Sequence, residues 1–128
     1  MAWLLDTNVM IHLRDGDPTG LDRVAALEGA VLMSVVTRVE LEGGVYREPA
    51  FATIRRARLD TMLAAIPTLA FDVTSADHYA SIVAQLGYSR RKLLDRMIAA
   101  QALAHRATVV TRNGDDFREI PGLPLLTW

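Results

Sequence analysis

The 128-residue chain contains no cysteine, and this absence excludes a disulfide framework, thiolate chemistry and cysteine-ligated zinc. It also lacks any apolar run close to the roughly 20 residues that cross a bilayer. Its first residues show neither the basic segment nor the apolar segment of a secretory signal peptide. Together these absences favour a protein of the reducing cytoplasm with no membrane partner.

Net charge is also small, at −1, so the chain as a whole has no electrostatic attraction to nucleic acid. Basic residues do cluster at 55–58 and 90–92, where a solvated helix face is the commoner explanation and a track for phosphates the alternative. Hydrophobic residues make up 51% of the chain and charged residues 23%, which is typical of a globular protein. No linker or internal repeat divides it, so we expect one domain over residues 1–128.

Short β-prone runs alternate with longer helical patterns along the chain. Strands are predicted at 3–6, 31–36, 69–73 and 108–111. Helices are predicted from about residue 7, in a short segment ending at Gly29, after Thr37, and at 52–66, 75–86 and 92–105. This alternation predicts an α/β fold, a three-layer α/β/α sandwich around a central, mainly parallel sheet.

Acidic and amide side chains follow the predicted strands. Asp6 ends the first strand, Glu40 lies a few residues past the second, and Asn113, Asp115 and Asp116 follow the last. Asp95 begins the alanine-rich helix, and helix starts in this topology can reach the same edge. Because parallel sheets bind ligands outside the carboxyl ends of their strands, we expect these side chains to converge at one rim.

Each acid also has a local explanation. Asp6 could cap the helix that follows it, and Asp95 could complement a helix dipole. The segment from Thr37 to Glu40 matches a capping box, in which the glutamate turns back to the first residue of the helix. The acids at 115 and 116 could belong to a turn, because Asn-Gly-Asp favours one.

Several carboxylates at one rim would repel one another and raise the pKa of at least one of them, unless a cation lies between them. An all-oxygen site of this kind suits Mg²⁺ or Mn²⁺. The histidines at 12, 78 and 105 lack the spacing of a zinc site, and only His12 follows Asp6 closely enough to approach the rim.

The segments LLDTNVMI (4–11), TRVELEGG (37–44) and LLDRMIAAQALAHRATVVTRNGDDF (93–117) resemble PIN-domain ribonucleases, and most closely the VapC-type toxins of bacterial toxin–antitoxin pairs. The motifs occur in the family's order, and the resemblance covers nearly the whole chain. It implies that the acidic catalytic and metal-binding positions are Asp6, Glu40, Asp95 and Asp116. Whether Glu40 is a ligand or the base, and whether Asp115 or Asp116 is the fourth acid, stays open.

The resemblance also implies supporting residues. Thr7 and Asn8 would support the site through hydrogen bonds, Asn113 would be a nearby polar member, and Thr111 would orient the attacking water or a metal-bound water. Basic residues near the rim are candidates to bind RNA: Arg38, Arg90, Arg91, Lys92 and Arg112.

The implied activity is metal-dependent endonucleolytic hydrolysis of RNA, and RNA rather than DNA rests on the family alone. The implied partners are a second copy of the chain and a cognate antitoxin. Two alternatives remain: a non-catalytic scaffold whose acids are only caps and turns, and a Mg²⁺-dependent phosphatase. The phosphatase would use an Asp-x-Asp pair, whereas Asp6 is followed two residues later by Asn8.

Overall fold

The structure is a computed structural model that describes residues 1–128, and a five-stranded sheet forms its centre. Its strands are β1 (Ala2–Leu5), β2 (Ala30–Ser34), β3 (Thr68–Leu69), β4 (Thr108–Thr111) and β5 (Leu125–Thr127). They lie in the order β3-β2-β1-β4-β5, and every neighbouring pair is parallel. All five carboxyl ends therefore point to one edge of the sheet.

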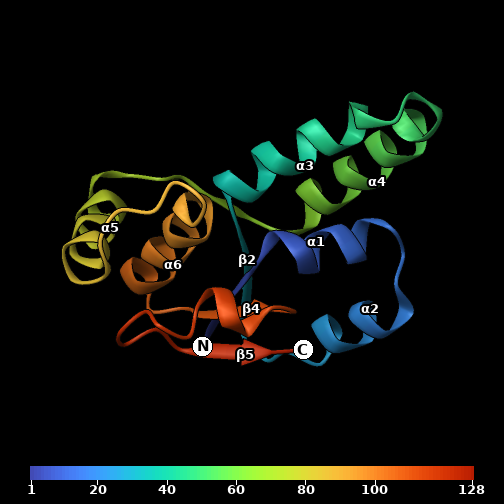
Figure 1. Cartoon of the computed structure of the whole chain (residues 1–128). Coiled ribbons are helices and arrows are strands. Elements are labelled where there is room, and N and C mark those ends of the chain that lie inside the picture. The colour runs from blue at the N-terminus through green and yellow to red at the C-terminus, as the bar shows by residue number, and fades with distance from the viewer.

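Helices cover both faces of this sheet (Figure 1). They are α1 (Thr7–Arg14), α2 (Pro18–Ala25), α3 (Val35–Arg47), α4 (Ala52–Ala65), α5 (Val73–Leu86) and α6 (Leu93–His105). Two 3₁₀ turns, η1 (Pro49–Phe51) and η2 (Gly114–Asp116), connect longer elements. No helix is both long enough and apolar enough to span a bilayer.

Two apolar cores lie on opposite sides of the sheet. Leu4 and Val109 pack with α5 and α6, whereas their chain neighbours Leu5 and Val110 pack with α1, α3 and α4. Successive residues of a strand face opposite sides, so two adjacent apolar residues serve both cores. This arrangement confirms the predicted three-layer α/β/α sandwich.

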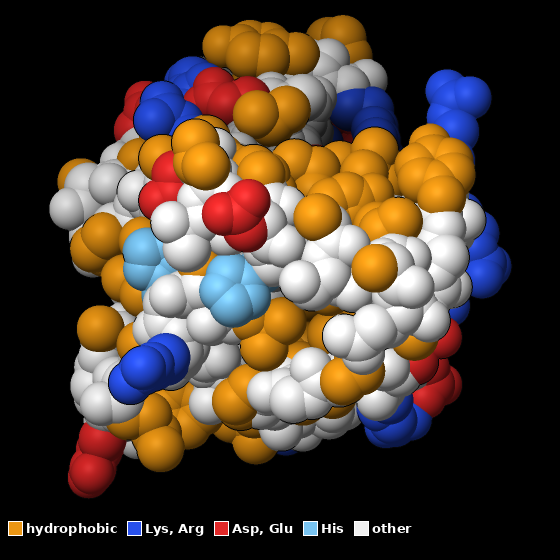
Figure 2. All heavy atoms as spheres, turned by 90° about the vertical axis from the view of Figure 1, so that its left-hand side faces the viewer, with side chains coloured by type: hydrophobic (Ala, Val, Ile, Leu, Met, Phe, Trp, Pro, Cys, Tyr) orange, Lys and Arg blue, Asp and Glu red, His pale blue; other side chains and the backbone are white.

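The outer surface of the α5–α6 layer carries exposed hydrophobic side chains (Figure 2). Val73, Tyr88 and Leu94, which belong to this layer and its connection, are 78%, 69% and 43% exposed. Hydrophobic side chains gather in the upper part of the view, while lysine and arginine lie mainly near its edges.

Two predicted strands were too long, and one strand was missed. Ser34 ends β2 and caps α3, since its hydroxyl accepts a hydrogen bond from the Val36 amide at 2.9 Å. Asp72 caps α5 in the same way through the Ser75 amide at 2.9 Å, so only Thr68–Leu69 is strand in that region. The short strand β5 was not predicted, because three residues after prolines carry little periodic signal.

The predicted capping box at Thr37 is wrong. Thr37 is the third residue of α3, and the cap is Ser34. The Glu40 carboxylate does not return to the start of its own helix but contacts α1. A longer-range contact therefore determines where Glu40 points.

Candidate active site at the carboxyl edge of the sheet

Asp6 lies at the centre of the rim, between β1 and α1, and is 4% exposed. Its Oδ1 accepts a hydrogen bond from the Thr7 amide at 2.8 Å, and its Oδ2 accepts one from the Thr111 hydroxyl at 2.9 Å. Burial raises the pKa of Asp6 above its ordinary value although both hydrogen bonds lower it, and the charges of Glu40 and Asp116 raise it further. Asp6 is thus a helix cap, as one prediction stated, and also a member of an acidic group.

Glu40 reaches the same rim from α3. The Thr7 hydroxyl donates to Glu40 Oε1 at 2.8 Å and lies 2.9 Å from the Thr37 hydroxyl. Since Thr7 has one hydroxyl proton and gives it to Glu40, Thr37 must donate to Thr7. This chain of hydrogen bonds ties α1 to α3 and holds Glu40 beside Asp6.

Thr111 is fully buried at the end of β4 and uses its whole hydrogen-bonding capacity inside the protein. Its hydroxyl donates to Asp6 and accepts from Asn8 Nδ2 at 3.3 Å and from the Asn113 amide at 3.0 Å. Asn8 also accepts from the Arg112 amide at 3.2 Å. No proton or lone pair of Thr111 is left for a water, so the geometry favours a role in positioning Asp6 over the predicted contact with water.

Asp95 lies in the first turn of α6, and its carboxylate makes no hydrogen bond within the protein. Burial raises the pKa of Asp95 to about 7, and the charges of Asp6, Asp116 and Glu40 raise it as well, whereas Lys92 lowers it. Three acids from other segments thus contribute to the raised pKa of Asp95. The structure thus brings the four predicted acids together at one rim.

The two neighbouring acids of η2 have different surroundings. Asp116 accepts a hydrogen bond from Asn113 Nδ2 at 2.9 Å and contributes its charge to the pKa values of Asp6 and Asp95. Asp115 is 79% exposed and pairs with Arg118. The fourth acid of the rim is therefore Asp116, and Asp115 lies outside the group.

The donor set bears on which cation the rim could hold. No three acidic or histidine side chains are gathered into a ready-made metal cage. Mg²⁺ commonly uses only one or two carboxylates and keeps several waters, so a rim of spaced carboxylates without histidine or cysteine fits a hydrated hard cation. Burial and the neighbouring acids raise the pKa values of Asp6 and Asp95, so a cation at the rim would stabilise their ionised forms.

The predicted basic residues divide into paired and unpaired groups. Lys92 lies 2.7 Å from Glu119, and Arg112 lies 3.7 Å from Asp17. The remaining three are exposed and form no salt bridge: Arg38, Arg90 and Arg91. These unpaired arginines can bind a polyanion without first breaking a salt bridge.

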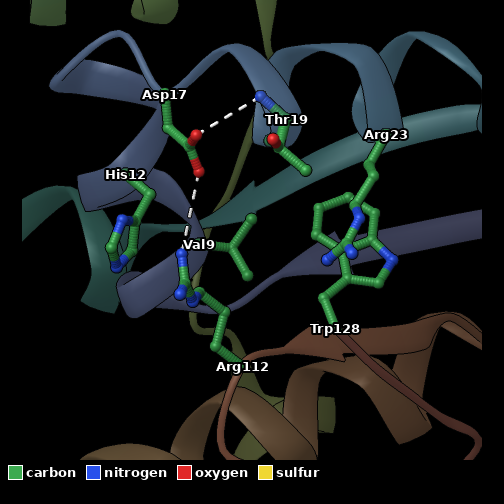
Figure 3. Close-up of a pocket in the computed structure, with 8 residues that line it drawn as sticks. Val9, His12, Asp17, Thr19, Arg23, Arg112 and Trp128 are labelled. Atoms are coloured by element: carbon green, nitrogen blue, oxygen red, sulfur yellow. Dashed lines mark hydrogen bonds and ion pairs between the residues drawn. The ribbon is translucent and has the colours of Figure 1, made fainter.

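Beside the rim, Arg112 borders a hollow of about 310 Å³ (Figure 3). His12 and Asp17 line the same hollow, where the guanidinium of Arg23 lies 5.8 Å from the centre of the Trp128 ring. His12 thus faces this hollow.

Gln101 and Ser34 connect the elements that carry the rim, and neither residue was predicted from the sequence. Gln101 is fully buried; its Nε2 donates to the carbonyls of Leu69 and Ala70 at 3.1 and 3.0 Å, and its Oε1 accepts from the Ser34 hydroxyl. These contacts join α6 to the ends of β2 and β3. The available signal was a lone amide within an alanine-rich helix, a pattern that is also typical of an exposed position.

Known proteins similar to this chain share its architecture. A family model described as "PIN domain" matches residues 3–123. The chain is 26% identical to ribonuclease VapC2 of Rickettsia felis and 28% identical to a tRNA(fMet)-specific endonuclease VapC of Shigella flexneri, in both cases over 100% of this chain and 98% of the relative. It is also similar to a chain of the DNA-bound VapBC structure from Salmonella typhimurium, with a TM-score of 0.87 and 26% identity over 100% and 98% of the two chains. The match across almost the whole length shows that this chain belongs to the PIN domain family.

Proposed function

We propose that this protein is a metal-dependent endoribonuclease of the VapC type, the toxin of a toxin–antitoxin pair. The observation that carries the proposal is the position of four acids from separate segments at the carboxyl edge of the sheet, where the charges of Glu40 and Asp116 help to raise the pKa of Asp6 and of Asp95. The names of its relatives, ribonuclease VapC2 and tRNA(fMet)-specific endonuclease VapC, support the same activity.

The geometry favours different roles for the acids. Asp6, Asp95 and Asp116 would hold Mg²⁺ or Mn²⁺, which supplies a water of lowered pKa and polarises the phosphoryl oxygen when bound. Thr7 and Thr111 fix both oxygens of the Asp6 carboxylate. Glu40 Oε1 is already bonded to Thr7, which leaves Oε2 to orient the attacking water and accept its proton.

Two protein partners belong to the proposal. Similar structures include a toxin–antitoxin complex from Klebsiella pneumoniae and a member of the VapBC family of toxin–antitoxin systems, which supports a cognate antitoxin. Bound at the rim, that antitoxin would block it. A second copy of the chain would cover the exposed side chains of Val73, Tyr88 and Leu94 on the α5–α6 layer. The RNA substrate would be held in single-stranded form, because folded RNA exposes readable bases mainly in loops.

The test is cleavage of total RNA and of isolated tRNA by the purified chain, with Mg²⁺, with Mn²⁺ and with EDTA. We expect endonucleolytic fragments with either metal and none with EDTA, and we expect the Asp95→Asn/Asp116→Asn double variant to be inactive. Metal-independent cleavage, or equal activity of the double variant, would refute the proposal. Hydrolysis of p-nitrophenyl phosphate in place of RNA would favour the phosphatase.

A further inference from the structure

A cavity of about 560 Å³ opens beside the proposed active site, between α1, α3 and α4. Its wall nearest the rim includes Thr7 and Glu40, the hydrogen-bonded pair described above. From there it extends along α1 to Arg14 and along α3 to Arg47, seven residues further on in each helix. Seven residues of helix rise about 10 Å, roughly the span of a dinucleotide.

Arg14 is a buried cation with spare hydrogen-bond donors. It is 5% exposed, and its only side-chain hydrogen bond joins Nε to Asp15 at 3.2 Å. Its Nη1 lies against Gly44 of the cavity wall, where an added Cβ would be 3.0 Å from that nitrogen. Its terminal nitrogens have no hydrogen-bond partner in the protein, and a phosphate can accept two guanidinium donors in parallel.

Arg47 and Arg55 add two more guanidinium groups to the wall. Arg55 donates to the Gly44 carbonyl and to Glu48, both at 3.1 Å, so the acid that lines this end of the cavity is already paired. Arg47 is exposed and forms no salt bridge or hydrogen bond through its side chain. The end of the cavity away from Glu40 therefore carries an excess of positive charge.

The geometry points to this cavity as a subsite that holds a backbone phosphate of the RNA next to the scissile one, with Arg14 and Arg47 as its ligands. The inference rests on the proposed function, because the cavity shares Glu40 with the hydrolytic rim. Anchoring a neighbouring phosphate positions the strand across the four acids, even though the chain has a net charge of only −1. The contact carries no base information, so it serves all sequences equally.

Binding without cleavage tests this subsite. The probe is a fluorescent 12-nucleotide single-stranded RNA of mixed sequence, titrated in EDTA at several salt concentrations. We expect Arg47→Ala to weaken binding several-fold and to lower the slope of log K against log[salt] by about 0.7, the value for one lost phosphate contact on a single strand. Arg47→Lys should restore most of the slope. Gly44→Ala, which displaces the Arg14 guanidinium, should also weaken binding.

Arg23→Ala is the matched control, since it removes the same charge from α2 on another side of α1. It should leave the salt slope unchanged, and thermal melting checks that every variant is folded. Equal slopes for wild type and Arg47→Ala would overturn the subsite, as would displacement of the RNA by polyglutamate as readily as by unlabelled RNA. Binding with the expected slopes but without metal-dependent cleavage would refute the proposed function and keep the subsite.

Discussion

Asp6 and Asp95 are two carboxylates of one rim, and burial is the largest cause of the raised pKa of each. Their surroundings nevertheless differ. Donors from α1 and β4 fix both carboxylate oxygens of Asp6, whereas the carboxylate of Asp95 makes no hydrogen bond to the protein. We call Asp6 the rigid arm of the site, because the protein holds its carboxylate in place before any ligand arrives. We call Asp95 the other arm, because only a cation would satisfy its charge.

The largest expected effect is on cleavage, and it should be the same for both acids. Asp6→Asn and Asp95→Asn should each reduce RNA cleavage by about a thousandfold or more, because each removes a charge that would hold the metal. Initial rates on a labelled RNA at saturating Mn²⁺ measure this. Activity within tenfold of wild type for either variant would remove that residue from the metal site.

Stability should distinguish the two arms. Asp95→Asn should stabilise the metal-free protein at pH 8 by about 1–2 kcal/mol, since it relieves repulsion at a position that loses no hydrogen bond. The free energy of unfolding of Asp6→Asn should stay within about 1 kcal/mol of wild type. Asparagine can still cap α1, but it offers the Thr111 hydroxyl fewer acceptor atoms. Urea unfolding in EDTA provides the comparison, and equal gains for both variants would contradict the difference between the arms.

Thr111→Val tests the rigid arm through a residue that would not touch the metal. Loss of the hydroxyl frees one oxygen of Asp6 and leaves Asn8 Nδ2 and the Asn113 amide without an acceptor. We expect cleavage to fall by about 10- to 100-fold and stability by about 1–3 kcal/mol. Thr111→Ser should recover most of both, and a Thr111→Val enzyme of normal activity would show that Asp6 needs no orientation.

The other arm should respond to pH and to metal. Because the folded pKa of Asp95 is about 7 and its ordinary value is 3.8, the folded state retains a proton that the unfolded state releases between these values. The contribution of Asp95 to stability is therefore complete below pH 4 and is lost as pH rises to 7. Carboxyl NMR titration should show a pKa near 7 in EDTA and a lower one with Mg²⁺. A pKa near 4 without metal would contradict the close group of acids.

The smallest effect should follow Asp115→Asn. This side chain is 79% exposed and pairs with Arg118, so its charge lies outside the group formed by the other acids. We expect cleavage within twofold of wild type and stability within about 0.5 kcal/mol, because surface ion pairs contribute little. Asp116→Asn, one residue further on, is the matched variant and should lose activity with the other acids.

Local patterns in the sequence were sufficient for the fold class and most element positions, and they predicted that acids such as Asp6 and Asp95 reach the carboxyl edge, because hydrophobic periodicity and parallel topology determine which side chains lie there. They left the choice between Asp115 and Asp116 open. The interpretation of Asp6 as a cap was correct, since capping depends on neighbouring residues. The interpretation of Glu40 as part of a capping box was wrong, because its partner is Thr7, 33 residues away in the sequence.

The sequence alone therefore determined which residue types could meet at the rim. Only the tertiary structure decided how each is held. The Thr111 hydroxyl uses all of its hydrogen-bonding capacity, Asp115 pairs with Arg118, and the buried Gln101 bonds to the ends of β2 and β3. The tertiary structure also placed Arg14 and Arg47 in one cavity with Glu40, from two helices that local patterns cannot align. The physical reason is that periodicity fixes the face of a helix or strand that is buried, whereas hydrogen-bond partners from distant segments depend on how those elements pack.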